Sequence, residues 1–216
     1  MGLQRFHRSV VVALISLVAA AGCTSGPSGD DSAAFSARVA EARAKKDREF
    51  LQLPDCGRGA DPCSPVPPAK RQATLPLKYF PPDQSYSTAA SLRLADQRPI
   101  FEMPTSTGAV RRMQRVGVLE FMLNGQPMKL GAFVEEGTQQ ITELFVPFAD
   151  ETTGKETYEA GRYLQLRPTS TNLYEIDFNE AFNPYCAYNK TYECPYPPPS
   201  NRLKVAIRAG EKAPSA

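Results

Sequence analysis

Histidine is almost missing from this sequence of 216 residues, in which His7 is the single example. His7 lies in a segment that we expect to be removed as a secretion signal, so the mature chain would contain no histidine. Histidine is the usual general base near neutral pH and the commonest metal ligand. Its absence excludes Ser-His-Asp and Cys-His catalysis and His-ligated zinc or non-haem iron. The sequence motifs of common hydrolases, dinucleotide-binding enzymes and metalloproteases are also absent, and we expect neither a cofactor nor a metal.

The sequence also lacks an apolar run long enough to span a bilayer as a permanent helix, which needs about 20 residues. Arg5 and Arg8 precede the shorter apolar run Val10–Ala21, and Gly22 and Cys23 follow it. This layout is typical of a secretory signal. We therefore predict export of the protein and removal of the signal before the cysteine.

The residues before Cys23 resemble a bacterial lipobox, in which the signal is cut off before a cysteine that then carries lipid. We predict that Cys23 is lipidated, so that residues 1–22 are the signal peptide and the protein is anchored to a membrane of the cell envelope. An ordinary signal followed by an incidental cysteine is the alternative. Thr24, by resemblance to enterobacterial lipoproteins, favours the outer membrane if the source is Gram-negative. The small polar residues 23–34 are predicted to form the lipidated cysteine and a flexible tether.

A surplus of charge of either sign is missing as well. Loss of the signal removes two arginines and leaves 23 cationic against 23 acidic residues in the mature chain. A protein that binds nucleic acid would need a basic surplus or a basic patch. We therefore do not expect nucleic acid as a partner.

The rest of the chain predicts a single β-rich domain over residues 35–212, followed by a tail at 213–216. Residues 35–53 have apolar side chains on one face and charges around the rest, which is typical of an amphipathic helix. Asn124 and Gly125 predict a tight hairpin turn. The strand-like segments favour an antiparallel barrel or two-sheet sandwich with one N-terminal helix. These segments are 75–80, 92–95, 100–103, 110–123, 128–134, 141–148, 162–167, 172–178 and 203–207.

The stretch Asp177–Pro199 is neither helix-like nor strand-like, and it is rich in proline, asparagine, tyrosine and cysteine. Prolines fix backbone angles, and asparagine side chains bond back to the backbone. Its tyrosines argue against disorder, because disordered segments are poor in aromatic residues. We therefore predict an ordered polar loop and regard it as the first candidate for a functional site.

Three functions are compatible with this loop and the turn at 150–163. The first is a binding domain for a small polar ligand, bound by Arg162, Tyr163, Asn179, Asn183, Tyr185, Tyr188 and Asn189. The second is a histidine-free hydrolase in which Glu156 and Asp177 act as acid and base. The third is a purely structural cap with no ligand. Mutually satisfied polar side chains with no cavity beside them would favour the cap.

Four cysteines remain besides Cys23, and they form two local pairs. Because an exported protein meets oxidising conditions, we predict disulfides between Cys56 and Cys63 and between Cys186 and Cys194. A zinc site made of all four thiolates is the alternative, but the usual CxxC spacing is missing. A catalytic thiol at Cys186 is a further, minor possibility.

Four motifs closely resemble a bacterial family of uncharacterised proteins, the domain-of-unknown-function family 1684. They read TTGKETYEAGRYL at 152–164, DFNEAFNPYCAYNKTYECPYPP at 177–198, SNRL at 200–203 and AGEK at 209–212. Thr153, Phe182 and Ser200 depart from the serine, tyrosine and glutamate of the family pattern. The resemblance covers residues 35–212 and implies no known activity. Because some members lack export signals, it leaves open whether Cys186 and Cys194 stay reduced.

Overall fold

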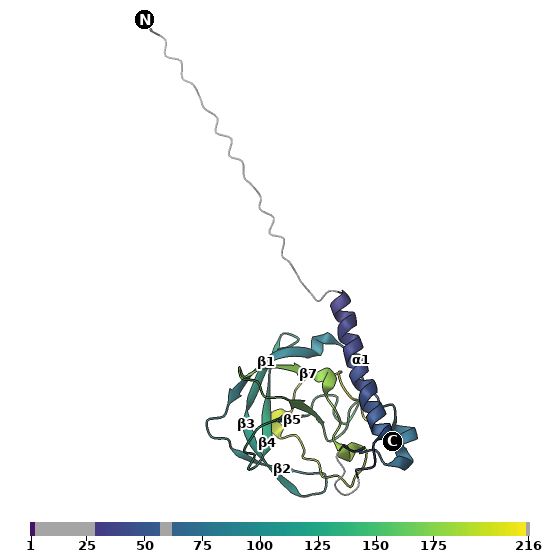
Figure 1. Ribbon diagram of the computed structural model, residues 1–216. Coiled ribbons are helices and arrows are strands. Elements are labelled where there is room, and N and C mark those ends of the chain that lie inside the picture. The colour runs from purple at the N-terminus through teal and green to yellow at the C-terminus, as the bar shows by residue number, and fades with distance from the viewer. Residues whose placement is uncertain (3–28, 57–61, 215–216) are drawn as a thin grey trace.

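Residues 29–56 and 62–214 fold into a curled antiparallel sheet with a long helix along one side (Figure 1). The computed structural model describes residues 1–2, 29–56 and 62–214. The rest of the predicted signal peptide, the predicted lipidation site Cys23 and the tether as far as residue 28 lie outside the described residues.

Seven strands form the sheet in the described part of the chain, and each pairs antiparallel to its neighbours. The order is β6-β5-β4-β3-β1-β7, while β2 pairs with the part of β3 that extends beyond β1. The sheet curls into a half-barrel, which confirms the predicted mainly β, antiparallel fold. The strands are β1 (Ser87–Leu94), β2 (Ile100–Pro104), β3 (Val110–Leu123), β4 (Gln126–Glu135), β5 (Leu144–Phe148), β6 (Arg162–Leu166) and β7 (Leu173–Asp177).

The hairpin between β3 and β4 is the predicted one. Its register runs from Leu123 opposite Gln126 back towards the start of β3. Asn124 and Gly125 both have positive φ, 49° and 74°, as a two-residue turn matching the strand twist requires.

The main hydrophobic core lies on the inner face of the sheet, where C-terminal segments fill the curl. Leu119, Leu130 and Val146 of the strands belong to this core together with Ile207 from near the C-terminus. Apolar burial of this extent is the main stabilising contribution to a fold. The inner face is therefore used mainly for packing.

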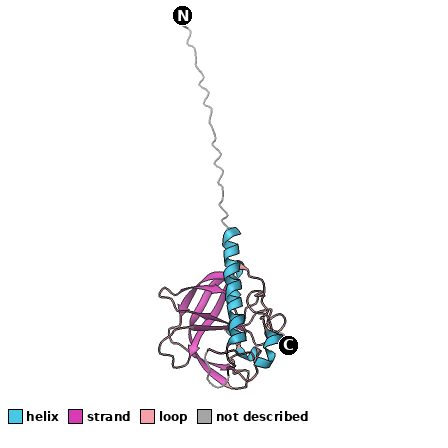
Figure 2. Cartoon of the chain, turned by 45° about the vertical axis from the view of Figure 1, so that its right-hand side comes forward, coloured by secondary structure: helices cyan, strands magenta, loops and turns pink. Residues whose placement is uncertain are grey.

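The helix α1 (Gly29–Gln52) stands beside the half-barrel, with the sheet on one side and loops on the other (Figure 2). It begins six residues before the predicted start at Phe35, so residues 29–34 are helical and do not belong to the tether. The acidic Asp31 favours a helix N-terminus there, since it complements the helix dipole. Its C-terminal half is attached through Lys46, whose Nζ lies 2.6 Å from Glu211 Oε1.

Two of the predicted strands are not strands. Residues 75–80 contain Pro76, lie next to two further prolines and make only an isolated bridge between Tyr79 and Glu211. Residues 203–207 follow a single bridge between Ala149 and Arg202 and then continue as irregular backbone. Both segments are apolar because they are buried against the core, and burial alone does not distinguish strand from irregular chain. A short helix, α2 (Arg71–Thr74), was not predicted.

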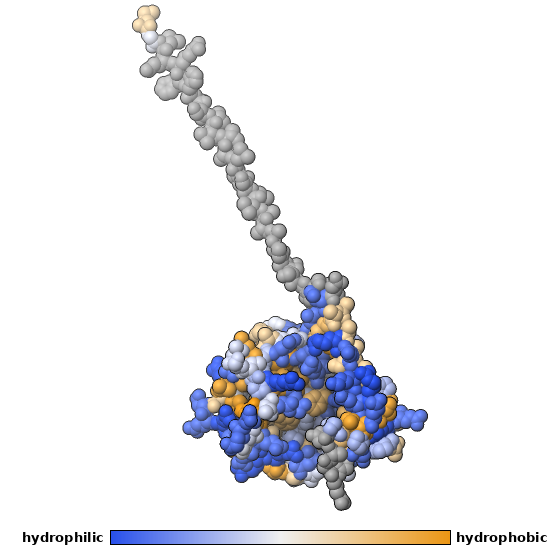
Figure 3. Space-filling view, viewed as in Figure 1, coloured by the Kyte–Doolittle hydropathy of each residue, from blue (hydrophilic) through white to orange (hydrophobic). Residues whose placement is uncertain are grey.

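On the face shown in Figure 3, the apolar patches are small and are separated by hydrophilic residues. Large apolar side chains are mostly in the core, as expected for a folded domain. Within the residues that the structure describes, no helix combines the length and the apolar character needed to cross a membrane.

Candidate functional site

The candidate site lies on the outer face of strands β3 to β6, at a point where a bulge changes which side chains of β3 face outward. The β3–β4 register shifts between Arg115 and Gly117, so that Met113 joins an outer cluster while Leu119 joins the inner core. A Cβ on residue 117 would lie 2.4 Å from the Arg93 carbonyl oxygen. Only glycine fits at this bulge, and the bulge is what brings polar and apolar side chains of β3 to the outer face.

Aromatic rings form the floor of the site. Phe133 of β4 is paired with Phe145 of β5 and is fully buried. Phe145 in turn contacts Tyr163 of β6 edge to face, with ring centroids 4.6 Å apart and an interplanar angle of 76°. Such contacts stabilise the relative positions of the rings. The floor is therefore fixed by the strands that carry it.

The loop of residues 177–199, which we call the signature loop, forms the roof. Phe182 pairs with Tyr163 through two backbone hydrogen bonds of 2.9 and 3.0 Å. Further along, the Tyr163 hydroxyl donates to the Pro195 carbonyl at 2.6 Å, and the Ser106 amide donates to the Cys194 carbonyl at 3.0 Å. The loop is thus attached to the sheet at both ends of the site.

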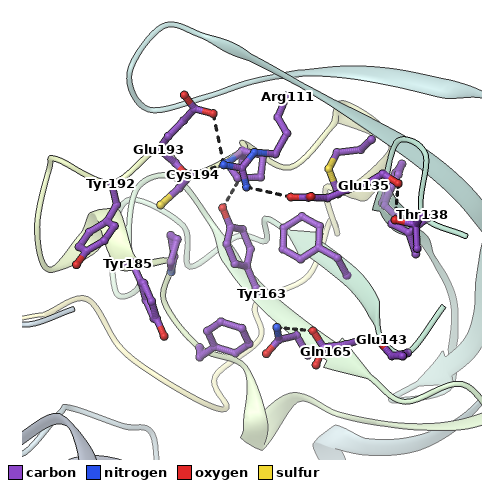
Figure 4. A pocket seen from close by; sticks show the side chains of 18 of the residues that line it. Arg111, Glu135, Thr138, Glu143, Tyr163, Gln165, Tyr185, Tyr192, Glu193 and Cys194 are labelled. Atoms are coloured by element: carbon purple, nitrogen blue, oxygen red, sulfur yellow. Dashed lines mark hydrogen bonds and ion pairs between the residues drawn. The ribbon is translucent and has the colours of Figure 1, made fainter. Parts of the chain in front are cut away.

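A cavity of about 450 Å³ lies between the floor and the roof. Tyr185 and Tyr192 lie together on one side of it, and Glu135 and Thr138 lie on the other (Figure 4). Its lining residues are Arg111, Met113, Phe133, Val134, Glu135, Thr138, Gln140, Thr142, Glu143, Phe145, Tyr163, Gln165, Phe182, Pro184, Tyr185, Tyr192, Glu193, Cys194 and Pro195.

Charged side chains surround the opening of the cavity. Arg111 of β3 lies between two carboxylates, 3.7 Å from Glu135 Oε1 and 3.4 Å from Glu193 Oε1 (Figure 4). A third carboxylate, that of Glu143, accepts a hydrogen bond of 2.6 Å from the Gln165 amide. The arrangement can hold a ligand with an apolar body and a polar or charged group.

Cys186 and Cys194 are free, buried thiols, so the predicted disulfide between them is not formed. Each sulfur has a hydrogen-bond partner: the Cys186 amide donates to Cys194 Sγ at 3.1 Å, and the Tyr158 hydroxyl donates to Cys186 Sγ at 3.9 Å. Spacing in the sequence cannot distinguish such a thiol pair from a disulfide. The other predicted disulfide, between Cys56 and Cys63, is present.

The two thiols titrate as a pair. A hydrogen bond from Cys194 stabilises the thiolate of Cys186 and lowers the pKa of Cys186 to about 7, in spite of burial. The same bond, with burial, raises the pKa of the Cys194 thiol. Burial likewise raises the pKa of Tyr163, so its hydroxyl stays protonated and can donate to Pro195.

Two of the predicted ligand-binding residues, Tyr163 and Tyr185, line the cavity. Arg162 does not. It is fully buried and donates to the carbonyl oxygens of Ala209, Ile207 and Glu211 as well as to Asp150. Burial lowers the pKa of Arg162, and the adjacent Asp150 carboxylate opposes this shift. Its contacts are those of a residue that attaches the C-terminal segment to β6.

The other predicted ligand-binding residues also bond within the protein. Asn179 contacts Asp83 and Asp177. The Asn183 backbone N–H and the Tyr188 hydroxyl donate to the buried Glu211 carboxylate at 2.7 and 2.6 Å, and the Asn183 side-chain amide donates to the Lys212 carbonyl at 2.8 Å. Asn189 accepts from the backbone and hydroxyl of Thr191. None of these four asparagine and tyrosine residues is among those lining the cavity described above.

The two predicted acid–base residues have separate partners. Glu156 is bound on the surface by Arg208, with a shortest distance of 2.9 Å. Asp177 caps a short helix by accepting from the Asn179 amide and is paired with Arg38 at 3.2 Å. Neither lines the cavity.

Sequence reasoning missed Arg111, Glu135 and Glu193 at the opening and the phenylalanines of the floor. A signal existed for the phenylalanine of β5, because all five residues of that strand are apolar, as in a strand buried on both faces. Among the described residues, no group of three or more His, Cys, Asp or Glu could hold a metal ion.

Comparisons with known proteins give a family and a related structure. A family model described as "Protein of unknown function (DUF1684)" matches residues 75–212. An uncharacterised protein of Haloarcula marismortui, whose structure was determined by NMR in solution, is 34% identical with a TM-score of 0.63. The match covers 85% of this chain and 96% of that one. No curated protein matches.

Proposed function

The chain belongs to the DUF1684 family of proteins of unknown function, and from its cavity we propose that it is a binding domain for a small organic molecule. The observation that carries the proposal is the cavity of about 450 Å³ between the aromatic floor and the signature loop. Ligand pockets are concave, mostly apolar, about 300 to 1,000 Å³ in volume, and have a few polar groups that orient the ligand.

The site is preformed, because contacts within the protein hold its side chains in place. Edge-to-face contacts fix Phe145 against Tyr163 and Tyr185 against Tyr192, and the Tyr163 hydroxyl is bonded to the roof at Pro195. A preorganised site loses little conformational entropy on binding. This supports binding of a ligand as the role of the signature loop, beyond closing the sheet.

Binding is favoured over catalysis by the position of the carboxylates that could act as acid and base. Glu156 and Asp177 are engaged by Arg208 and Arg38, and neither is in the cavity wall. An acid–base pair must reach the same substrate atoms. The geometry therefore supports a binding domain better than a hydrolase.

The proposal is tested by a ligand-observed NMR screen of a fragment library, together with native mass spectrometry for molecules that copurify. We expect hits that bind the wild type and not Thr142→Trp, because the indole would fill the cavity from its wall. Ser170→Trp, on an exposed loop outside the cavity lining, is the matched control and should keep the hits. Equal binding to both tryptophan variants would contradict the proposal.

We also propose that the domain is exported and anchored by lipid on Cys23. The apolar run at 10–21 and the residues before Cys23 support this, and so does the disulfide between Cys56 and Cys63, because disulfides persist in oxidising compartments. Metabolic labelling with a fatty-acid analogue should mark the wild type and not Cys23→Ala. Labelling of the alanine variant, or a wild type found unlabelled in the soluble fraction, would refute the anchor.

A further inference from the structure

The aromatic rings of the cavity come from both its floor and its roof. Six line it: Phe133, Phe145, Tyr163, Phe182, Tyr185 and Tyr192. Tyr163 is at the centre, in edge-to-face contact with Phe145 at 4.6 Å and with Phe182 at 5.9 Å between centroids. An aromatic ring carries negative potential on its face and attracts cations. A cavity lined in this way is favourable for a cation that has an apolar body.

The charged residues of the lining add to this preference. Among the described residues that line the cavity, three carry a carboxylate and one carries a cationic group. The carboxylates are those of Glu135, Glu143 and Glu193, and the cation is Arg111. Arg111 is already close to two of the carboxylates, at 3.7 and 3.4 Å. Its positive charge is therefore offset, and the lining as a whole has an excess of negative charge.

The carboxylate of Glu193 is held in place within this arrangement. Its Oε2 accepts a hydrogen bond of 3.3 Å from the Thr107 hydroxyl. The main-chain carbonyl oxygen of Glu193 accepts one of 3.4 Å from the Arg111 guanidinium. The Thr107 hydroxyl, in the turn between β2 and β3, thus orients the Glu193 carboxylate in the lining of the cavity. A carboxylate that is oriented beforehand can bind a cation with little reorganisation.

From these observations we infer that the cavity takes a small organic cation, an ammonium group carried on a compact apolar body. The inference rests on the proposed function of the same cavity and names the class of ligand. A carboxylate or phosphate ligand would meet three carboxylates, and it would have to displace two of them, Glu135 and Glu193, from Arg111 to form an ion pair. A neutral ligand would gain the apolar contacts alone.

Three probes of matched shape separate these cases: choline, its neutral isostere 3,3-dimethylbutan-1-ol, and the anion 3,3-dimethylbutanoate. Their dissociation constants are measured by protein-observed NMR titration of the full domain at low salt. We expect choline to bind about three- to thirtyfold more tightly than the alcohol, as cation–π attraction and the carboxylates imply. The anion should bind most weakly.

Glu193→Gln is the variant that tests the charge. It should weaken choline severalfold, leave the alcohol unchanged and strengthen the anion, because Arg111 would lose one of its partners. Glu151→Gln, an exposed change away from the cavity, should alter none of the three.

Tighter binding of the alcohol or of the anion to the wild type overturns the inference and leaves the proposed function standing. Failure of all three probes to bind also overturns it. The fragment screen with Thr142→Trp decides the proposed function separately.

Discussion

Single polar residues of the family motifs act chiefly as links between backbone segments. Arg162 connects β6 to three carbonyl oxygens of the C-terminal segment, and Glu211 accepts hydrogen bonds from Lys46, Asn183 and Tyr188. Both side chains are almost fully buried. A buried charge is tolerated only when it is paired and hydrogen-bonded. These residues resemble a ligand site in the sequence because binding a ligand and binding the protein's own backbone use the same chemical groups.

Arg162→Met should be strongly destabilising. It leaves the Asp150 carboxylate buried without its cation and removes the donor from the backbone carbonyls, for a loss of about 3 to 5 kcal/mol in the free energy of unfolding. Arg167→Met, at an exposed position just past the end of β6, should change stability by less than about 0.5 kcal/mol. Urea unfolding of both variants measures the difference. Similar stabilities would contradict the role given to Arg162.

Gly210 of the AGEK motif is required by close contact as well as by its backbone angle. Its φ is 76°, and a Cβ there would lie 2.5 Å from the Ala181 carbonyl oxygen. Gly137 has a similar φ of 82° with nothing within 4 Å of such a Cβ. Gly210→Ala should therefore cost about 1 to 3 kcal/mol more than Gly137→Ala in thermal unfolding. Equal costs would show that the contact is unimportant.

The thiol pair predicts a pH dependence. The pKa of Cys186 is lowered from its ordinary 9.0 to about 7, so between these values the unfolded chain binds more protons than the folded one. Stability should therefore rise with pH across this window, and the contribution should be lost as the pH falls through about 7. The difference in thiolate absorbance at 240 nm between wild type and Cys186→Ala should have its midpoint near 7.

Cys194→Ala is the control for this titration. It removes the S–H group that stabilises the Cys186 thiolate, so the midpoint should move up towards the ordinary value for a thiol. A wild-type midpoint that is already near that value would contradict the thiol pairing.

At the scale of elements, local signals predicted what depends on local geometry. The β3–β4 hairpin follows from Asn124-Gly125, and the helix follows from its apolar face. Residues 75–80 and 203–207 are apolar like strands, but the pairing at each is limited to an isolated bridge. Tyr79 pairs with Glu211, and Arg202, just before the second segment, pairs with Ala149. The pairing of these segments is decided by the folded core, and no local pattern encodes it.

The helix α1 depends on a small apolar cluster at its C-terminal end. Phe50 is 6% exposed and packs in this cluster with Tyr188 of the signature loop, at 5.9 Å between ring centroids. Phe50→Ala should cost about 3 kcal/mol and should speed amide hydrogen exchange in the C-terminal half of α1. The adjacent Leu51 is 55% exposed, so Leu51→Ala should leave exchange unchanged. Identical exchange in the two variants would refute this attachment.

Across the whole molecule, the two faces of one sheet have different roles. The inner face holds the main core, while the outer face of β3 to β6, covered by the signature loop, holds the cavity. The sequence pointed to this loop and to Tyr163 and Tyr185. It could not point to Arg111 or Glu193, because their meeting depends on the bulge at Gly117 and on the path of the loop over the sheet. Composition identifies a loop, but only the fold decides which of its side chains face a cavity.

The central claim is that this covered outer face is a ligand-binding site, and chemical-shift mapping with labelled aromatic side chains tests it most directly. During titration with choline or with a hit from the fragment screen, we predict that the largest shifts occur at Tyr163, Tyr185 and Tyr192. The shifts should disappear in Thr142→Trp. Shifts centred instead on Tyr79 beside α1, or shifts that persist unchanged in Thr142→Trp, would contradict the claim.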